Sequence, residues 1–581
     1  MSGKRRYPQW FDGHKVNEIL FCEEFRKEHP MICVKGKFFT KDGLVEDEKN
    51  LETEIFNRKK LRSVELSCIV KKKTRKENTM EWIVTVLPDG KKLAAKAGDI
   101  LLNVLRAHDL APDAPCGGAG VCGKCSVIVN GETVRSCTYQ IEEDITVHLI
   151  PREDTTRVLT GGSGAEVAME PWGKGAMLAY DIGTTTVVCY LLQEGTGTVL
   201  ATCSMVNPQQ SFGADVISRI QAALGGEQEK LTKLIRREMA RLMQKVCEEA
   251  GITPADIGVV SVVGNPCMQQ LFLGISPDNL ARIPFDPVLT KGDTCPAGAF
   301  LPDCGNAALL IVPDISGYVG ADTVGCVLAT ALDRAEELTL MVDIGTNGEM
   351  VLGNRERMTA CATAAGPALE GARIHFGMRG AEGAIDHVWL EDGKLRCSVI
   401  GGGKAVGICG SGLIDAVAVL VEAGLLNRRG RIQSREQAAV LADHLREIDG
   451  QRVFDLIDGV CLTQNDIREV QMAKGAIAAG INLMAQHLGV EVSEIRQVLL
   501  AGAFGSFIRS ENACRIGLLP PVLHDRIRAV GNAAGSGARR LACNKRELDR
   551  AQRVVETAEF LELAALPGFQ RCFAKNMEFG S

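Results

Sequence analysis

Two segments of this chain repeat the same short plan, and this repeat restricts the fold more than any other feature. Residues Ala176–Leu192 (AMLAYDIGTTTVVCYLL) and Leu338–Asn354 (LTLMVDIGTNGEMVLGN) each contain an apolar strand, an Asp-Ile-Gly-Thr turn and a second apolar strand. The aspartates of the two turns, Asp181 and Asp343, lie 162 positions apart (343 minus 181). Solenoid repeats have periods of roughly 20–50 residues, so this much longer separation predicts two duplicated halves of one α/β domain.

The chain is too long for a single hydrophobic core. Its 581 residues predict three or four domains at roughly 100–200 residues each. A hydrophobic fraction of 46% and a charged fraction of 24% are typical of globular proteins and exclude a disordered or fibrous chain. No apolar run reaches the roughly 18–20 residues of a membrane-spanning helix, and a net charge of -6 argues against a general nucleic-acid binder.

Cysteine usage indicates a reducing compartment. The chain holds 21 cysteines, and its first residues carry basic side chains without the apolar stretch of a secretory signal. In such a chain cysteines serve as ligands, nucleophiles or core residues rather than as disulfides. We therefore expect a cytoplasmic protein that binds neither membrane nor nucleic acid.

Composition changes along the chain and suggests where it divides. Residues 1–79 hold 19 Lys and Arg against 13 Asp and Glu, which predicts a basic N-terminal appendage of unknown role. From Met80 a strand, an Asp-Gly turn, a second strand and an amphipathic helix follow one another, which predicts a small domain over residues 80–150. Residues 151–175 are rich in glycine, serine and charge and predict a linker.

Four cysteines in one glycine-rich segment stand apart from the others. Cys116, Cys122, Cys125 and Cys137 have C-x5-C-x2-C-x11-C spacing within APCGGAGVCGKCSVIVNGETVRSC. The glycines permit the turns and the close backbone approach that an iron–sulfur cluster requires. Zinc is the competing metal, but structural zinc sites usually present two C-x2-C pairs and this segment has one. The segment favours a [2Fe–2S] cluster, with zinc and unliganded thiols as the alternatives.

The two Asp-Ile-Gly-Thr turns predict a nucleotide-phosphate site. Such a site needs backbone N–H groups, small hydroxyls and a carboxylate that reaches a divalent metal through water, and both turns supply all three. Three further glycine-rich stretches, Cys361–Ile374, Gly407–Leu420 and Val498–Ile508, predict strand-to-helix junctions. Free amides at a helix N-terminus favour phosphate or ribose oxygens, although each stretch could also be a turn that only packs a helix on a strand.

Together these elements resemble the actin, sugar kinase and heat-shock ATPase superfamily, in which two duplicated halves close on ATP. The Walker GxxxxGKS/T pattern does not occur, and the one GxGxxG match, Gly118–Gly123, lies inside the cysteine segment, which disfavours those nucleotide folds. From Met80 to the C-terminus the chain contains, in order, the cysteine segment, VGNPCM, PDISGYVGADT, VDIGTNGEM, CATAAGPALEGA, GICGSGLIDA and LAGAFGS. With these motifs it resembles, more specifically, the reductive activators of corrinoid-dependent methyltransferases.

The resemblance implies a multidomain α/β fold. It places a β-grasp [2Fe–2S] ferredoxin domain at residues 80–150, a first actin-like half at 176–337 and a second actin-like ASKHA half at 338–581. The implied activity is ATP-dependent reductive activation of a corrinoid protein, in which one electron passes from the cluster to inactive Co(II) and regenerates Co(I) for methyl transfer. The implied cofactors are the cluster and ATP with Mg²⁺. The implied partners are a corrinoid protein and an upstream low-potential electron donor, and a homodimer is compatible with this interpretation.

The resemblance also implies roles for individual residues. Cys116, Cys122, Cys125 and Cys137 hold the cluster. No catalytic residue is assigned beyond Asp181 and Asp343 as candidates that position phosphate or the water of Mg²⁺. The other expected nucleotide-site residues are Gly183, Thr184, Thr185, Gly345, Thr346, Asn347 and Gly348 at the phosphates, and Gly366, Glu370, Gly410, Ser411, Gly412, Gly502 and Phe504 at the sugar and base.

Three other functions share parts of this pattern. A small-molecule kinase of the same fold with a fused electron-transfer domain needs a general base, for which Asp415 and Asp322 are the suggestive candidates. A redox adaptor would bind ATP without hydrolysing it. An activator of 2-hydroxyacyl-CoA dehydratases shares the ATPase fold but lacks an N-terminal ferredoxin domain. The nine histidines show no metal-ligand spacing and are expected on the surface or in the core.

Overall fold

The chain divides into two units, residues Met1–Glu81 and Trp82–Ser581, in the computed structural model. Cys116, Cys122 and residues 151–167 of the predicted linker lie outside the described residues, as does most of the predicted basic appendage. The structure describes residues 31–34, 37–40, 43–45, 81–108, 110–112, 114, 125–149, 168–371, 373–438, 440–448 and 450–580.

The described part of the first unit is one small antiparallel sheet. Its three short strands pair in sequence order, and each neighbouring pair is antiparallel. The strands are β1 (Met31–Val34), β2 (Lys37–Thr40) and β3 (Gly43–Val45).

The described residues between 81 and 149 form a five-stranded mixed sheet and one helix. Helix α5 (Leu101–Ala107) buries Leu101, Val104 and Leu105 in the apolar cluster of this sheet. Its strands, in spatial order, are β5 (Lys91–Lys96), β4 (Glu81–Leu87), β8 (Ile145–His148), β6 (Ser126–Val129) and β7 (Glu132–Arg135), with β4 and β8 parallel.

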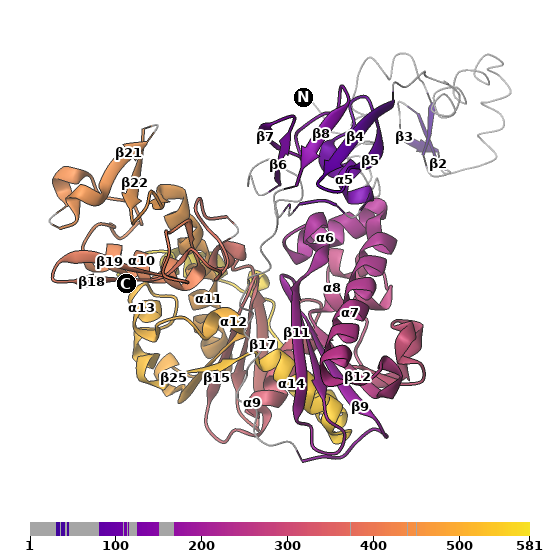
Figure 1. The fold of residues 1–581 in the computed structure, drawn as a ribbon. Coiled ribbons are helices and arrows are strands. Elements are labelled where there is room, and N and C mark those ends of the chain that lie inside the picture. The colour runs from indigo at the N-terminus through magenta and orange to yellow at the C-terminus, as the bar shows by residue number, and fades with distance from the viewer. Residues whose placement is uncertain are drawn as a thin grey trace. The chain divides into compact units, whose positions relative to one another are not determined.

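A six-stranded sheet forms the core of the first half. Strand β9 (Ala176–Ile182) buries Leu178, Ala179 and Tyr180 in succession, as expected of a strand that is covered on both faces. The long amphipathic helix α7 (Gln228–Ala250) packs its apolar side on this sheet (Figure 1). The strands, in spatial order, are β11 (Val199–Val206), β10 (Thr186–Leu192), β9, β12 (Ile257–Gly264), β14 (Ala308–Ile311) and β13 (Asp293–Pro296).

The second half repeats this arrangement. Strands β15 (Thr339–Ile344) and β16 (Gly348–Gly353) pair antiparallel, as β9 and β10 do, and the first strand of each hairpin also pairs in parallel with a strand from later in the chain. The turn of each hairpin follows its aspartate, Asp181 or Asp343. The topology therefore confirms the predicted duplication. The second sheet has the order β25 (Ile527–Gly531), β24 (Gln497–Ala501), β15, β16, β17 (Met358–Thr363) and β26 (Ala558–Phe560).

Two helices pack against each other where the halves meet. Helix α14 (Ala533–Cys543) follows β25 of the second sheet, yet it packs on α9 (Ala321–Thr330), which follows β14 of the first sheet (Figure 1). Glycine allows this close approach, because a Cβ atom on Gly537 would overlap the backbone of Gly325. The apolar cluster around these helices contains residues of both sheets, so the two halves share a core.

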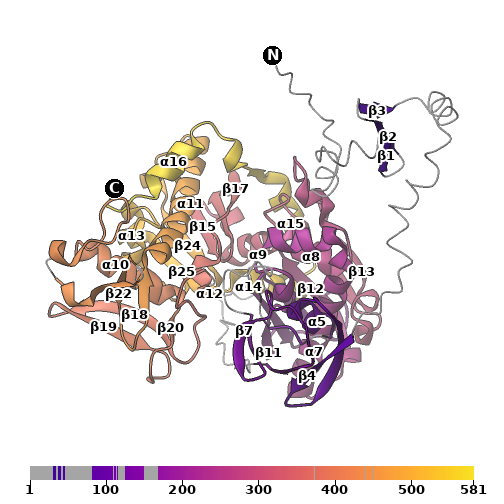
Figure 2. The same cartoon turned by 90° about the horizontal axis from the view of Figure 1, so that it is seen from above.

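Further strands and helices enlarge the second half (Figure 2). The apolar helix α10 (Gly410–Glu422) packs on strand β18 (Ala384–Glu391), and α11 (Gln464–Leu488) packs on β16 and β17. Among the described helices, none combines the length and the apolarity that crossing a membrane requires. The other elements are β19 (Lys394–Val399), β20 (Gly407–Ile408), β21 (Leu445–Ile448), β22 (Gln451–Asp455), β23 (Cys461–Thr463), α6 (Val216–Ala222), α8 (Pro266–Leu273), α12 (Gly502–Gly505), α13 (Ser510–Arg515), α15 (Arg546–Thr557) and α16 (Phe569–Asn576).

Candidate nucleotide site

A cavity of about 510 Å³ lies between the two halves, at the turns that follow β9 and β15. Both turns are closed by their own glycine: Gly183 N donates to the Thr186 carbonyl at 2.9 Å, and Gly345 N donates to the Asn347 carbonyl at 3.0 Å. These glycines therefore shape the turns, and the threonines that follow them, Thr184 and Thr346, line the cavity. The predicted residues that line the cavity are Asp181, Gly183, Thr184, Thr185, Asp343, Gly345, Thr346, Asn347, Glu370, Gly410, Ser411 and Gly502.

Three predicted glycines, Gly348, Gly366 and Gly412, are not among the described residues that line the cavity. Gly348 and Gly412 are packed so tightly that a Cβ atom on either would collide with neighbouring atoms. Gly366 has a φ of 76°, in the left-handed region that favours glycine, and it shapes the loop after β17. The side chain of Phe504 lies outside the described residues, whereas Phe507 from the same stretch lines the cavity.

Carboxylates gather on the wall of this cavity, among them Asp181, Asp322, Asp343 and Glu349. Burial, reinforced by neighbouring carboxylates, raises the pKa of Asp181 to about 7, that of Asp343 to about 6 and that of Asp322 to about 7. Burial also raises the pKa of Glu349. Desolvated acids this close together are unfavourable as anions unless a cation neutralises them. Among the described residues no three of these groups are placed to hold a metal directly, so the donor set suits a divalent cation that is held through water and phosphate oxygens.

A glutamate joins the two turns across the cavity. Thr185 Oγ1 donates to Glu370 Oε2 at 2.7 Å, and Thr346 Oγ1 donates to the same oxygen at 2.8 Å. The two hydroxyl oxygens lie 3.2 Å apart. The resemblance placed Glu370 at the sugar and base; in the structure it lies between the two phosphate turns, because the 3₁₀ turn Pro367–Glu370 directs it there. One carboxylate thus contacts both halves.

Buried polar side chains hold the first turn in place. Asn265 Nδ2 donates to Thr184 Oγ1 at 3.0 Å, and Asn207 Nδ2 donates to the Gly183 carbonyl at 2.8 Å. The guanidinium of Arg219 donates to the Thr184 carbonyl, and burial lowers the pKa of Arg219 to about 10. Sequence reasoning missed all three supports. Asn265 could have been found, because it belongs to the VGNPCM motif, but Asn207 and Arg219 lie in no motif.

A histidine–carboxylate pair forms another part of the wall. His387 lines the cavity, and its Nδ1 lies 2.9 Å from Asp415 Oδ2. Asp415 is 1% exposed and also accepts a hydrogen bond of 2.5 Å from Asn512 Nδ2. His387 was expected on the surface or in the core, but the fold of β18 brings it to the nucleotide cavity. Asp415 is engaged inside the protein, which disfavours it as the general base of a kinase.

The N-terminus of α10 completes the wall. The Ser411 hydroxyl donates to the Asp386 carbonyl at 2.9 Å, so its only proton is already used. The first backbone N–H groups of α10 remain as donors at this point, and they carry the positive end of the helix dipole. This wall therefore favours a negatively charged or oxygen-rich ligand.

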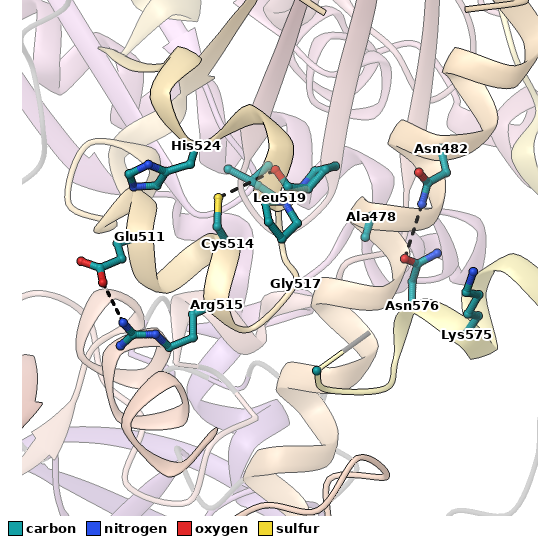
Figure 3. Close-up of a pocket in the computed structure, with 13 residues that line it drawn as sticks. Ala478, Asn482, Glu511, Cys514, Arg515, Gly517, Leu519, His524, Lys575 and Asn576 are labelled. Carbon is teal, nitrogen blue, oxygen red and sulfur yellow. Dashed lines mark hydrogen bonds and ion pairs between the residues drawn. The ribbon is translucent and has the colours of Figure 1, made fainter. Parts of the chain in front are cut away.

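A larger cavity of about 670 Å³ lies elsewhere in the second half, among α11, α13 and α16 (Figure 3). Figure 3 shows Arg515 paired with Glu511 and the amide of Asn482 directed at Asn576. Its lining contains neither an Asp-Ile-Gly-Thr turn nor a group of carboxylates. Chemistry rather than size therefore makes the cavity between the halves the candidate nucleotide site.

Two of the four predicted cluster ligands belong to the described residues. Cys125 and Cys137 are both buried, and they share one small apolar cluster. Ser136 holds the two segments together, because its hydroxyl and its N–H donate to the Cys125 carbonyl at 2.8 and 3.1 Å. The described residues, which do not include Cys116 and Cys122, contain no group of three or more His, Cys, Asp or Glu placed to hold a metal.

The duplicated sheets and the phosphate cavity between them define an ATPase of the actin-like, or ASKHA, class. Residues 337–581 match the family model described as the C-terminal domain of RACo, the ASKHA domain, and residues 176–335 match the RACo middle region. The chain belongs to the RACo family. Its ASKHA fold implies ATP binding.

Comparisons with individual relatives support the assignment to this family. The chain is 37% identical to the corrinoid activation enzyme RamQ of Eubacterium limosum over 423 residues, which cover 69% of this chain and 70% of that protein. It is 25% identical to the [Co(II) methylated amine-specific corrinoid protein] reductase of Methanosarcina barkeri, over 69% of this chain and 76% of that protein. A solved structure of a reductive activator for a corrinoid, iron-sulfur protein matches with a TM-score of 0.64 and 28% identity, over 86% of this chain and 98% of that one.

Proposed function

We propose that this chain is an ATP-dependent reductive activator of a corrinoid protein, which passes one electron from a [2Fe–2S] cluster to Co(II) and regenerates Co(I). The observation that carries the proposal is the carboxylate-lined cavity between the halves of a chain whose relatives are named for corrinoid activation. We assign residues 80–150 to the ferredoxin domain, 151–175 to the linker, 176–337 to the first half and 338–581 to the second. The protein acts in the cytoplasm and receives electrons from a low-potential donor.

The proposed nucleotide site uses both halves. Phosphate oxygens take the backbone N–H groups of the two turns, and Asp181 and Asp343 hold Mg²⁺ through water. Bound Mg²⁺ supplies positive charge that neutralises the phosphates and the carboxylates. Thr184 keeps the first turn in shape, because its side chain is held by Asn265 and its carbonyl by Arg219. The α10 N-terminus and His387 face the remainder of the ligand.

The proposed cluster site uses Cys116, Cys122, Cys125 and Cys137. The bound cluster supplies one electron at a low potential, near about -400 mV for plant-type centres. Burial of Cys125 and Cys137 in an apolar cluster supports this assignment, since it keeps water away from both thiols. The Ser136 hydrogen bonds fix the position of the Cys125 backbone relative to Cys137.

ATP is required because the electron moves uphill to cobalt. Each 100 mV of uphill transfer of one charge costs about 2.3 kcal/mol. A ligand that distinguishes two conformations by about 10⁴-fold supplies about 5.5 kcal/mol, which offsets a little over 200 mV. In this proposal the nucleotide closes the two halves on the Co(II) form of the partner, and hydrolysis releases it.

The test uses the anaerobically reconstituted protein, a corrinoid protein poised as Co(II), and Co(I) absorbance as the readout. The full chain is expected to contain iron and to form Co(I) only when ATP is present. Cys125→Ser is expected to lose iron and Co(I) formation, whereas Cys397→Ser, a matched change on β19, is expected to keep both. Colourless, iron-free protein after reconstitution would overturn the proposal.

A further inference from the structure

The hydroxyl protons of Thr185 and Thr346 are already used. Each threonine hydroxyl carries a single proton, and both hydroxyls donate to Glu370 Oε2, at 2.7 and 2.8 Å. They are therefore not free to donate to phosphate while Glu370 is in place. The hydrogen-bond donors left for the phosphates are backbone N–H groups, whereas the two threonine hydroxyls hold Glu370 in position.

The second carboxylate oxygen of Glu370 has a different environment. Within the described part of the chain, no hydrogen bond to Oε1 occurs, and Glu370 lines the cavity. Oε1 lies 4.0 Å from the position that a Cβ atom on Gly345 would take, so it faces the second phosphate turn. One oxygen of the carboxylate is anchored and the other is open beside the phosphate site. A general base requires this combination of fixed orientation and a free acceptor.

We propose that Glu370 orients the water that attacks the terminal phosphoryl group of ATP and accepts its proton. The inference rests on the proposed function and adds a named residue to it. The water oxygen forms a bond to the terminal phosphorus, the bond from that phosphorus to the bridging oxygen breaks, and ADP leaves with the electron pair. The proton of the water passes to Glu370 and then to solvent. Thr185 and Thr346 are positioning residues.

This arrangement makes hydrolysis conditional on the position of the two halves. Thr185 belongs to the first half and Thr346 to the second. Both hydroxyls can therefore reach Glu370 only when the halves are close together, as in the structure, where the two hydroxyl oxygens lie 3.2 Å apart. A partner that keeps the halves closed keeps both hydroxyls on Glu370, whereas separated halves release one threonine and leave the carboxylate loosely oriented. Docking of the corrinoid protein can therefore control the rate of hydrolysis without touching the nucleotide.

The main test is Glu370→Gln, which keeps the shape of the side chain but removes its basicity. Single-turnover hydrolysis is expected to fall by about 10²–10⁴-fold, whereas binding of a non-hydrolysable ATP analogue, measured by calorimetry, stays at the wild-type affinity and shows that the variant is folded. Glu391→Gln is the matched control, because Glu391 lies exposed on β18 and pairs with Arg396. Wild-type hydrolysis by Glu370→Gln would overturn the inference and leave the proposed function standing. Wild-type protein that binds no ATP would overturn both.

The threonines give a second, independent test. Thr185→Ala and Thr346→Ala are expected to lower kcat with little change in the KM for ATP, and Thr185→Ser, which keeps the hydroxyl, is expected to restore kcat. If the hydroxyls bound phosphate directly, the alanine variants would raise KM instead. That result would overturn the positioning role.

Discussion

Asn532 Nδ2 donates a hydrogen bond of 2.9 Å to Asp181 Oδ2, and this bond joins the second half of the molecule to the first phosphate turn. The same side chain accepts a hydrogen bond of 2.7 Å from Gly535 N and so caps α14. Because α14 packs between the halves, one asparagine connects their interface to a carboxylate of the nucleotide cavity. Nucleotide binding at Asp181 can therefore act on that interface directly.

Replacing Asn532 with alanine removes both bonds. Loss of the cap is expected to lower the free energy of unfolding by about 1 kcal/mol, seen as a lower urea midpoint. The Asn532 hydrogen bond lowers the pKa of Asp181, so its loss makes that carboxylate easier to protonate and weakens MgATP binding. Calorimetry at neutral pH measures the affinity. Asn482→Ala, in the larger cavity, should bind nucleotide normally, and an equal loss in both variants would contradict this account.

Because α9 and α14 cross so closely, a single methyl group added at the crossing is expected to lower the stability of the protein strongly. Gly537→Ala places a Cβ atom on the backbone of Gly325, and overpacking of this kind costs about 1–3 kcal/mol. The urea midpoint should fall accordingly. Gly225→Ala is the control, because no atom lies within 4 Å of its Cβ position and alanine suits a helical segment better by about 0.5–1 kcal/mol. Two variants of equal stability would argue against the close crossing.

Lys474 predicts a pH dependence of stability. Its Nζ donates to the carbonyls of Asn576 and Glu578, both at 2.6 Å, and burial lowers its pKa to about 8. Lysine in an unfolded chain has a pKa near about 10.4. Between these values the unfolded state binds more protons, so the contribution of Lys474 to the free energy of unfolding rises with pH.

Lys474→Met is expected to lose this slope. Urea denaturation of both proteins at pH values of about 8 and about 10 measures it, and the difference between them isolates Lys474 because the other titrating groups are common to both. Lys233→Met serves as the control, since Lys233 lies exposed on α7 beside Glu229. A Lys474→Met protein with the wild-type pH slope would contradict the prediction.

Variants of His387 and Asp415 are expected to differ in their effects on nucleotide binding and on stability. His387→Gln is expected to weaken nucleotide binding with little change in stability, because His387 is partly exposed on the cavity wall. Asp415→Ala leaves Asn512 and His387 without their partner, and an unsatisfied buried group costs about 1–3 kcal/mol. Denaturation and analogue binding are measured on the same samples. Equal stability losses in the two variants would be the contrary result.

Local pattern was enough to predict the duplicated halves. The strand, Asp-Ile-Gly-Thr turn and second strand are contiguous in sequence, and the chemistry of phosphate binding applies to the turn itself. This reasoning predicted that Asp181 and Asp343 belong to one site, and both residues line the same cavity. The cysteine spacing predicted a cluster by the same kind of argument, and of its four ligands the structure describes Cys125 and Cys137.

Contacts between distant segments could not be predicted in this way. Glu370 meets Thr185 across 185 sequence positions, so its place between the phosphate turns depends on how the halves close. His387 belongs to no local sequence motif, because its partner Asp415 lies on a helix 28 positions later. Motif glycines are ambiguous for a further reason: Gly412 serves packing, whereas Gly410 in the same motif lines the cavity.

The central claim is that electron transfer and nucleotide hydrolysis are coupled. The direct measurement is ATP turnover by the anaerobic protein, with the corrinoid partner held either as Co(II) or as Co(I). The account predicts faster turnover with the Co(II) form, and formation of Co(I) only in the presence of ATP. Turnover that is unchanged by the partner, together with Co(I) formation that needs no nucleotide, would contradict it.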